Sequence, residues 1–126
     1  MTTATLWESG RESHLLDEII AGRKTIEGRL NRGKFALYKP GDQIWLRRDH
    51  RDENGELQNG EPRQVLVEIV AIRKYSSFLE MVKTEGYERV IPQAMSAEAA
   101  AGEYDTYYPA EDQATYGILA IEIRKL

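Results

Sequence analysis

The sequence GRKTIEGRL, residues 22–30, contains the strand around which the rest of the fold can be assigned. From Thr25 to Leu30, small or apolar residues alternate with polar residues, and alternation with period two predicts a short β-strand. The polar face carries Thr25, Glu27 and Arg29, so ionisable groups of both signs lie together on it. A strand that serves only the core needs no such cluster. We interpret this strand as part of a functional site.

Regular elements are predicted before this strand. Residues 3–8 form a candidate strand near the N-terminus. Apolar residues at helical spacing then predict a helix that ends at a glycine cap, Gly22. These apolar residues are Leu15, Leu16, Ile19 and Ile20.

Turn signals divide the middle of the chain. Lys39-Pro40-Gly41-Asp42 places proline and glycine at the central positions of a type II turn, which leads into a strand over residues 43–48. The pairs Asn54-Gly55 and Asn59-Gly60 indicate a long, mobile hairpin connection. The strand that follows, residues 64–72, is apolar on both faces, so we expect it in the centre of the sheet.

The C-terminal part combines two helices with a closing strand. Ser77 and Glu80 have the spacing of a capping box for a helix to about residue 85, and Ser96 caps a second helix that runs to Tyr107. Residues 115–125 alternate and close the sheet. Five strands and a helical insertion predict an α+β fold, a small mixed β-barrel with helices at its rim, and a single domain over residues 1–126.

The composition excludes several classes of protein. With 126 residues and 41% hydrophobic content, the chain can bury a core without disulfides. It has no cysteine, and His14 and His50 lie in different predicted elements, so we expect neither a metal ion nor another cofactor. No apolar run is long enough to span a membrane and no signal-peptide pattern occurs, which predicts a cytoplasmic protein without a membrane partner. The oligomeric state stays open.

The charge is distributed unevenly. The net charge is −4, but residues 23–51 hold nine basic and three acidic side chains, so this segment is +6 and the remainder is −10. A confined basic block in an acidic protein favours a local anion site over a surface that coats nucleic acid. A solvated loop rich in arginine and lysine is the alternative.

Several motifs together resemble the ASCH domain family, in its stand-alone bacterial or archaeal type. They are Gly22-x-Lys24-x-x-Glu27-x-Arg29, the turn Pro40-Gly41-Asp42 before a strand, Tyr75 ahead of a capped helix, Tyr107-Tyr108-Pro109, and Tyr116-Gly117-x-Leu119-Ala120-Ile121. The resemblance covers nearly the whole chain. It implies a PUA-like β-barrel, a cleft between the barrel and the helices, and recognition of RNA or nucleosides.

Two activities are associated with members of that family, hydrolysis of the acyl amide of N4-acylcytidine nucleosides and cleavage of RNA. The amidohydrolase branch carries Gly-x-Lys-x-x-Thr-x-Arg and a glutamate from the later helical region. Lys24 and Arg29 match this pattern, whereas Glu27 stands where the threonine would be. The expected hydroxyl nucleophile is therefore absent unless the neighbouring Thr25 replaces it. The later glutamate stays open among Glu85, Glu88 and Glu98.

The candidate catalytic residues are Lys24 and Glu27. Burial lowers the pKa of a lysine and a neighbouring carboxylate restores it, so this pair has the residue types that acid/base chemistry needs. The structural alternative is a salt bridge between Glu27 and either Lys24 or Arg29.

Candidate ligand-binding residues surround this pair. Arg29 offers a rigid fork of donors that suits a phosphate or a base edge. Gly28 in mid-strand indicates either the close approach of a ligand or backbone, or a bulge. Tyrosines can stack on bases, although tyrosines in a fold of this size more often belong to the core. The full set is Arg29, Gly28, Thr25, Arg32, Lys34, Tyr75, Tyr108 and Tyr116.

These residues predict a domain that binds single-stranded RNA or a modified nucleoside in a basic cleft, with ribonuclease activity left open. The alternative is an enzyme, an amidohydrolase acting on N4-acylcytidine nucleosides, in which Lys24 assists proton transfer.

Overall fold

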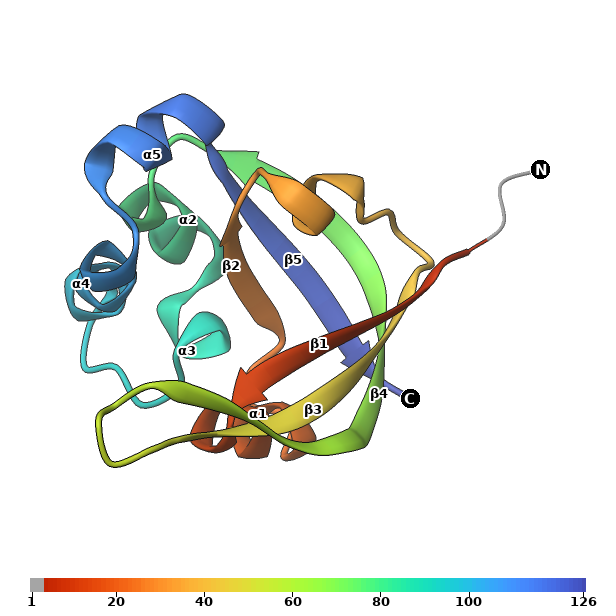
Figure 1. Ribbon diagram of the computed structural model, residues 1–126. Coiled ribbons are helices and arrows are strands. Elements are labelled where there is room, and N and C mark those ends of the chain that lie inside the picture. Colours follow the sequence, from red (N-terminus) through yellow and green to blue (C-terminus); the bar gives the residue numbers. More distant parts are fainter. Residues whose placement is uncertain (1–3) are drawn as a thin grey trace.

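One five-stranded mixed sheet organises the part of the chain that the computed structural model describes, residues 4–126 (Figure 1). The strand order is β1-β3-β4-β5-β2; β1 pairs with β3 in parallel, and the other pairs are antiparallel. The strands are β1 Leu6–Glu12, β2 Ile26–Leu30, β3 Gln43–Arg51, β4 Leu57–Tyr75 and β5 Ile118–Lys125. The helices are α1 Ser13–Ile20, the 3₁₀ helix η1 Gly33–Leu37, α2 Phe78–Glu85, α3 Tyr87–Val90, α4 Ala97–Tyr107 and α5 Ala110–Tyr116.

The sheet curls but its ladder does not close. Strands β1 and β2 are its two edges, and no backbone pairing joins them within residues 4–126. The predicted α+β fold with a mixed sheet and helices at its rim is present, whereas the predicted barrel is not confirmed. We call the gap between β1 and β2 the seam.

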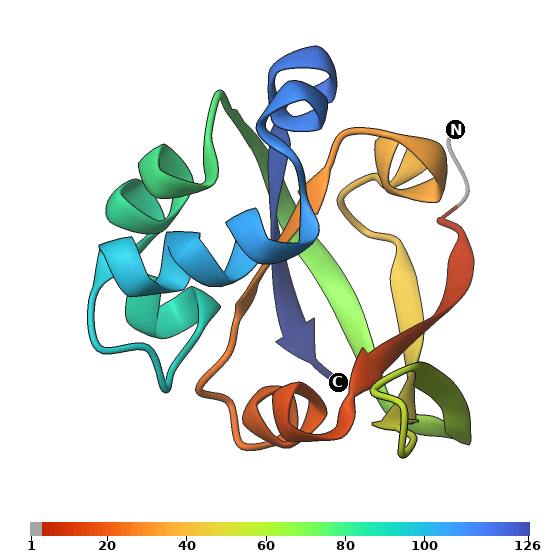
Figure 2. The ribbon, with the colours of Figure 1, turned by 60° about the vertical axis from the view of Figure 1, so that its left-hand side comes forward.

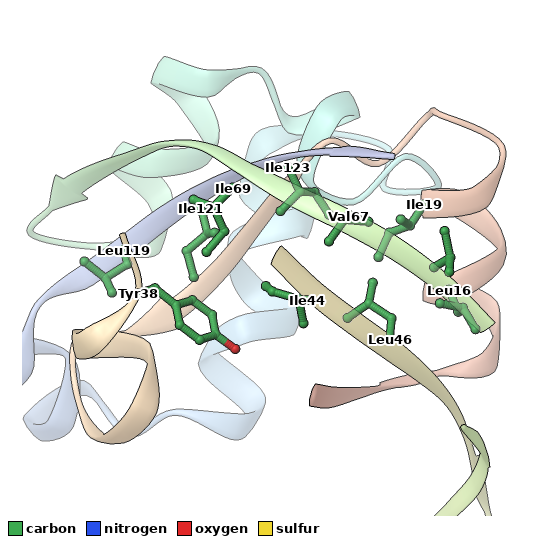
Figure 3. Close-up of a cluster of buried hydrophobic side chains, with 11 residues drawn as sticks. Leu16, Ile19, Tyr38, Ile44, Leu46, Val67, Ile69, Leu119, Ile121 and Ile123 are labelled. Carbon is green, nitrogen blue, oxygen red and sulfur yellow. The ribbon is translucent and has the colours of Figure 1, made fainter. Parts of the chain in front are cut away.

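Two hydrophobic clusters lie on opposite faces of the sheet. The first fills the inside of the curl beneath α1, as Figure 3 shows. The second lies between the sheet and the helices α2 to α4, which Figure 2 shows as a separate layer. Strand β5 serves both, because Leu119 and Ile121 belong to the first cluster and Ile118 and Ala120 to the second. Burial on both faces explains why this strand is apolar almost throughout.

The position of β2 determines where its polar face points. In the antiparallel ladder Glu27 pairs with Ile121 and Arg29 with Leu119, so these charged residues share the face that carries the first cluster. The inside of the curl is therefore apolar under α1 and charged at the seam.

Most local signals are confirmed. Gly22, with φ +82°, follows α1, and Gly41, with φ +95°, occupies the predicted turn. Ser77 and Ser96 accept hydrogen bonds from the backbone amides of Glu80 and Ala99, which caps α2 and α4. Strand β4 lies between β3 and β5 as expected for a central strand.

Other boundaries differ from the predictions. The first strand begins at Leu6, and the predicted start at Thr3 lies outside the described residues. The long mobile connection is wrong, because β3 and β4 continue to a short turn at Asn54-Gly55. Gly60 lies inside β4, where an added Cβ atom would come within 1.9 Å of the Arg48 carbonyl oxygen. Close packing between strands explains this glycine, not a turn.

Three short helices were not predicted, and the first of them is the 3₁₀ helix η1. Helix α3 follows Gly86 directly, and α5 begins after Pro109. Residue 115, predicted to start the closing strand, belongs to α5, and β5 begins only after Gly117, whose φ is +76°. Among residues 4–126, no helix combines the length and the apolar character that a membrane span requires.

Candidate ligand-binding site at the seam

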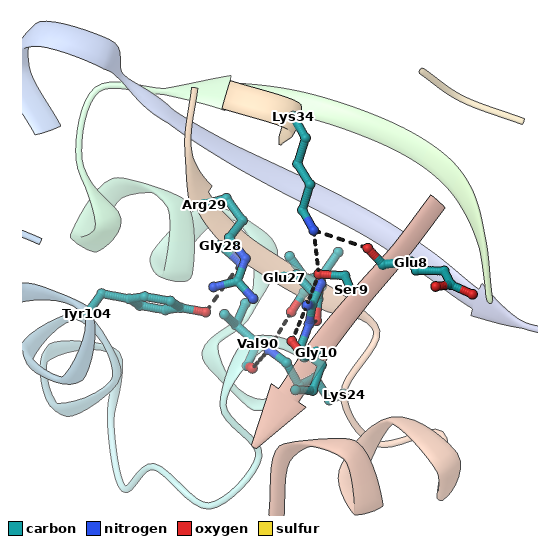
Figure 4. Close-up of polar contacts among 12 residues, drawn as sticks. Glu8, Ser9, Gly10, Lys24, Glu27, Gly28, Arg29, Lys34, Val90 and Tyr104 are labelled. Atoms are coloured by element: carbon teal, nitrogen blue, oxygen red, sulfur yellow. Dashed lines mark hydrogen bonds and ion pairs between the residues drawn. The ribbon is translucent and has the colours of Figure 1, made fainter. Parts of the chain in front are cut away.

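A buried ion pair crosses the seam between the two sheet edges. The Nε and Nη2 atoms of Arg11, on β1, donate to both carboxylate oxygens of Glu27, on β2. Each residue is only 3% exposed. The remaining Arg11 nitrogen donates to the Ser9 hydroxyl at 2.8 Å and to the Gly10 carbonyl at 2.6 Å. The donors of Arg11 are therefore committed within the protein. Figure 4 shows the polar contacts around Glu27 and Lys24.

This pair also fixes the protonation of Glu27. Burial would raise the pKa of the carboxyl group, but the charge and hydrogen bonds of Arg11 outweigh burial and lower it from 4.5 to about 2. A carboxylate with this pKa, whose two oxygens are already occupied, is a weak proton acceptor at neutral pH. Its geometry is that of the structural ion pair, with Arg11 as the partner in place of Lys24 or Arg29.

Lys24 lies behind the same seam. Its ammonium group donates to the carbonyl oxygens of Ile26 at 2.9 Å and Val90 at 2.5 Å, and the residue is 4% exposed. Burial lowers the pKa of Lys24 from 10.5 to about 8, although the Glu27 carboxylate opposes this shift. Lys24 is therefore mainly charged at pH 7 and is close to titration at physiological pH.

Arg29 is the least satisfied cation of the group. Its Nη1 donates to the Tyr108 hydroxyl at 3.3 Å, and its guanidinium carbon lies 5.1 Å from the centre of the Phe35 ring. Its Nε atom is buried and has no hydrogen-bond partner within residues 4–126. Burial opposes the charge, but Glu27 raises the pKa of Arg29, so this side chain remains a cation.

Tyrosines of α4 form one wall of the site. Tyr104 stacks on Phe78 with ring centres 4.3 Å apart, and its hydroxyl accepts a hydrogen bond from the Gly28 amide at 3.3 Å. A Cβ atom at Gly28 would lie 2.8 Å from Met81 Cε and 2.9 Å from Tyr104 Cζ. The ladder pairs Gly28 with Ala120 without a bulge. The close approach at this glycine thus comes from side chains of α2 and α4.

These groups line a cleft of about 290 Å³. Its cationic floor consists of Arg11, Lys24 and Arg29, and its aromatic wall consists of Tyr104, Tyr107 and Tyr108. At the mouth, Arg51 pairs with Glu12 and stands 5.9 Å from the centre of the Tyr107 ring. Residues 4–126 hold no cluster of three or more acidic or histidine side chains that could bind a metal ion.

A second, wider hollow of about 660 Å³ lies between the end of β5 and the start of β2. Two pairs of its charged residues form ion pairs, Arg124 with Glu68 and Arg89 with Glu122. Thr25 lies here and accepts a hydrogen bond from Arg89 Nε at 3.3 Å. We regard the smaller cleft as the candidate site, because it alone of the two combines buried cations with an aromatic wall.

The structure brings together part of the predicted site. Lys24, Arg29 and Tyr108 line the cleft, and Glu27 and Gly28 lie on the strand that forms its floor. Lys34 reaches the seam, where its ammonium group donates to the Glu8 carbonyl at 3.1 Å and to the Ser9 hydroxyl at 3.3 Å.

The remaining predicted residues lie elsewhere. The Tyr75 hydroxyl donates to Glu85 at 2.5 Å, and Arg32 stands over the Tyr116 ring and pairs with Asp112 at 3.6 Å. Thr25 lies in the wider hollow. None of these four predicted residues, Tyr75, Arg32, Tyr116 and Thr25, lines the cleft.

None of the three candidates for the later glutamate lines the cleft. Glu85 is held by Arg73, and Glu98 pairs with Lys83 at 3.6 Å. Neither they nor Glu88 line the cleft, whereas Glu103 does, one residue before Tyr104. Glu103 is exposed at the mouth.

Sequence reasoning missed Arg11, Tyr104 and Glu103. Arg11 lies past the predicted end of the first strand, and its partner Glu27 is 16 residues away. Tyr104 lies in a predicted helix with other tyrosines, and nothing in its local sequence distinguishes it from a core residue. The aromatic pattern of residues 104–108 is the one signal that could have directed attention to this helix.

Solved structures resemble this chain over almost its full length. The crystal structure of hypothetical protein PH0355 matches with a TM-score of 0.80 at 37% sequence identity, covering 97% of this chain and 100% of that one. The solution NMR structure of protein PF0455 from Pyrococcus furiosus matches with a TM-score of 0.75, also at 37% identity, covering 97% of this chain and 98% of that one.

A more distant structure shows the fold alone. The crystal structure of protein EF3133 from Enterococcus faecalis V583 matches with a TM-score of 0.59 at 13% sequence identity. The match covers 100% of this chain and 78% of that one. No curated protein matches the chain. A family model for the ASCH domain, in contrast, matches residues 13–126. With nine-tenths of its length matched by that model, the chain belongs to the ASCH domain family.

Proposed function

We propose that this protein binds single-stranded RNA or a modified nucleoside in the cleft at the seam. The observation that carries the proposal is the cationic floor of Arg11, Lys24 and Arg29 beneath a wall of tyrosines from α4 and its C-terminal cap. RNA binding is the role associated with the ASCH family, and the model of this family matches residues 13–126 of the chain.

The two sides of the cleft suit the two parts of a nucleotide. An aromatic face stacks on any base, and exposed single-stranded bases are the parts of RNA that proteins read most directly. An arginine fork binds a phosphate or a base edge with two parallel hydrogen bonds. A volume of about 290 Å³ is close to the lower limit for small-molecule pockets, so the cleft has room for about one nucleotide.

A binding role also agrees with the state of Glu27. Since both its oxygens are bonded to Arg11, we assign this residue to holding the two sheet edges in position around the ligand. In this role Glu27 places Arg29, two residues further along β2, at the floor of the cleft.

A second candidate is hydrolysis, and Lys24 is the observation that favours it. A buried lysine with a pKa of about 8 can give or accept a proton near neutral pH, which amide hydrolysis of an N4-acylcytidine nucleoside requires. Against it, Glu27 occupies the place of the threonine nucleophile and Thr25 faces the wider hollow. Glu103 is the carboxylate at the mouth that would complete such a site.

One experiment separates these functions. The purified protein is incubated with a labelled single-stranded RNA and, separately, with N4-acetylcytidine, and both are followed by chromatography. We expect the RNA to be retained unchanged. Cleavage of the strand would identify a ribonuclease, turnover of the nucleoside would identify the amidohydrolase, and no retention of either compound would reject the proposal.

A further inference from the structure

We infer that the cleft binds the terminal phosphate of a nucleotide, a phosphate monoester that carries two negative charges, in preference to an uncharged nucleoside. This inference rests on the proposed function and names the chemical group that the cleft selects. A free mononucleotide and the phosphorylated end of an RNA strand share this group.

The first argument is the charge balance of the cleft floor. Three cations meet there, Arg11, Lys24 and Arg29, whereas Glu27 is the one buried carboxylate within residues 4–126 that faces them. The buried floor therefore has two positive charges more than negative ones. At the mouth, Arg51 and Glu12 compensate one another.

Two further titratable groups lie at the mouth. Glu103 is exposed and His14 pairs with Glu12 at 3.3 Å. Charges at this exposed mouth are screened by solvent, whereas charges on the buried floor are screened much less. The two excess positive charges on the floor are consequently the charges that interact most strongly with a bound ligand.

Most other buried charged groups in the described chain have a charged counterpart, and Asp42 instead accepts hydrogen bonds from the Trp7 indole and two backbone amides. Asp49 is paired with Arg47, Glu85 with Arg73 and Glu18 with Arg23. Buried charges are costly unless they are paired, so an unpaired excess at one place indicates that the partner comes from outside the protein. A dianion supplies the two missing negative charges.

The second argument is which donors are free. Arg11 has its donors bound to Glu27, Ser9 and Gly10. Arg29, in contrast, contacts one neutral hydroxyl at 3.3 Å, and its buried Nε has no partner within residues 4–126. An ammonium group has three donors, and Lys24 uses two on backbone carbonyls. Arg29 and the third Lys24 donor are therefore available to phosphate oxygens.

The third argument is the size of the cleft. With room for about one nucleotide, the base lies against the tyrosine wall while its phosphate reaches the floor. A phosphate in the middle of a strand is a diester with one negative charge. It would leave one positive charge of the floor unbalanced. A terminal phosphate matches both the charge and the available space.

Calorimetry tests the inference with four ligands at pH 7.5: cytidine, cytidine 5′-monophosphate, its methyl ester with one charge, and inorganic phosphate. Two charge-assisted hydrogen bonds predict that the monophosphate binds at least about tenfold more tightly than cytidine, with the methyl ester between them. Equal affinities of cytidine and its monophosphate would overturn the inference. An RNA octamer with a 5′-phosphate or a 5′-hydroxyl then distinguishes a strand end from a free nucleotide.

Variants locate the effect. Arg29→Gln should reduce the advantage of the monophosphate to less than about threefold, whereas Arg124→Gln, which changes an arginine 62% exposed on its side chain and outside the cleft, should preserve it. Loss of the advantage in both variants alike would contradict the assignment to the cleft. RNA that binds equally with either end, together with equal affinities of cytidine and its monophosphate, would reject the terminal phosphate and leave the proposed function intact, while the absence of any RNA or nucleotide binding would reject both.

Discussion

Arg11 on β1 and Glu27 on β2 connect the two edges of the sheet through a buried ion pair, at a place where no backbone hydrogen bond connects them. The sheet is thus held in its curled form by side chains at the point where a barrel would be closed by its ladder. Both the stability of the fold and the shape of the cleft depend on this contact.

Removing either member of this ion pair should destabilise the folded protein. We expect Arg11→Met or Glu27→Leu alone to lower the free energy of unfolding by about 3 to 5 kcal/mol, because each leaves a buried charge unpaired. The double variant Arg11→Met/Glu27→Leu should recover most of this loss, since neither charge remains. Urea unfolding of the four proteins measures the coupling energy between the two residues.

The exposed pair Arg124 and Glu68 is the control, and removing it should lower the free energy of unfolding by less than about 1 kcal/mol. Equal effects at the two pairs would show that burial does not decide their strength.

The same pair predicts how stability depends on acid. The pKa of Glu27 is about 2 in the folded protein and about 4.5 when the chain is unfolded, so its contribution is fully present above pH 4.5. As the pH falls from 4.5 to 2, about 3 kcal/mol should be lost. Urea unfolding between pH 2 and 7 measures this slope. Other carboxylates contribute as well, so the comparison is with the Arg11→Met/Glu27→Leu variant, whose curve should be flatter over this range. Parallel curves would contradict the assigned pKa.

The role of Arg29 can be separated from its charge. Arg29→Lys retains the charge and removes the fork of donors, so RNA affinity should fall almost as far as in Arg29→Ala, by about tenfold or more. The melting temperature should barely change in either variant, because the one hydrogen bond that Arg29 donates goes to a neutral hydroxyl. Fluorescence anisotropy with a labelled RNA and thermal unfolding give the two readouts. If both variants melted much earlier than the parent, Arg29 would serve the fold and not the ligand.

Two glycines allow a matched test of the tyrosine wall. Gly28→Ala places a methyl group against Tyr104 and Met81, so it should cost about 1 to 3 kcal/mol and weaken RNA binding by displacing Tyr104. Gly102→Ala, in α4, meets no atom within 4 Å and should raise stability by about 0.5 to 1 kcal/mol without changing binding. Thermal unfolding and anisotropy measure both effects. A Gly28→Ala protein that bound RNA normally would remove Tyr104 from the proposed site.

The salt dependence of RNA binding reports the size of the contact. Each phosphate neutralised on a single strand contributes a slope of about 0.7 in the logarithm of affinity against the logarithm of salt concentration. A cleft with room for one nucleotide predicts a slope of about 0.7 to 2. Anisotropy titrations between 50 and 300 mM salt determine it. A slope several times steeper would place most of the contact outside the cleft, on the exposed arginines of the sheet.

The sequence was most informative where a short stretch determines its own structure. The strand at residues 26–30, the turn at Gly41 and the caps at Ser77 and Ser96 all depend on neighbours within a few residues. The correspondence of Lys24 and Arg29 to a family motif also directed attention to this strand, whose Arg29 lines the candidate cleft.

The partners of that strand could not be predicted in the same way. Arg11 reaches Glu27, and Tyr104 reaches Gly28, only because the curled sheet and α4 bring distant segments together. The family match begins at residue 13, after Arg11, so it offers no help with this residue. Tyr75 shows the opposite failure, since its hydroxyl is bound by Glu85 on the helix that follows it. The presence of a tyrosine in the sequence could not reveal that its hydroxyl would bind Glu85 and not a ligand.

The free edges of β1 and β2 have a consequence for aggregation. An unpaired edge normally exposes a row of amides and carbonyls to which a strand of another molecule can add. Here side chains occupy that row on both edges. On β2, the Lys24 ammonium group donates a hydrogen bond to the Ile26 carbonyl, and the Tyr104 hydroxyl accepts one from the Gly28 amide.

On β1, the carbonyls of Glu8 and Gly10 accept hydrogen bonds from Lys34 and Arg11. An incoming strand would have to displace these four side chains and separate a buried ion pair before its first backbone bond could form. The open sheet therefore carries its own protection against intermolecular strand addition, and variants that weaken the seam should form aggregates before they lose their secondary structure.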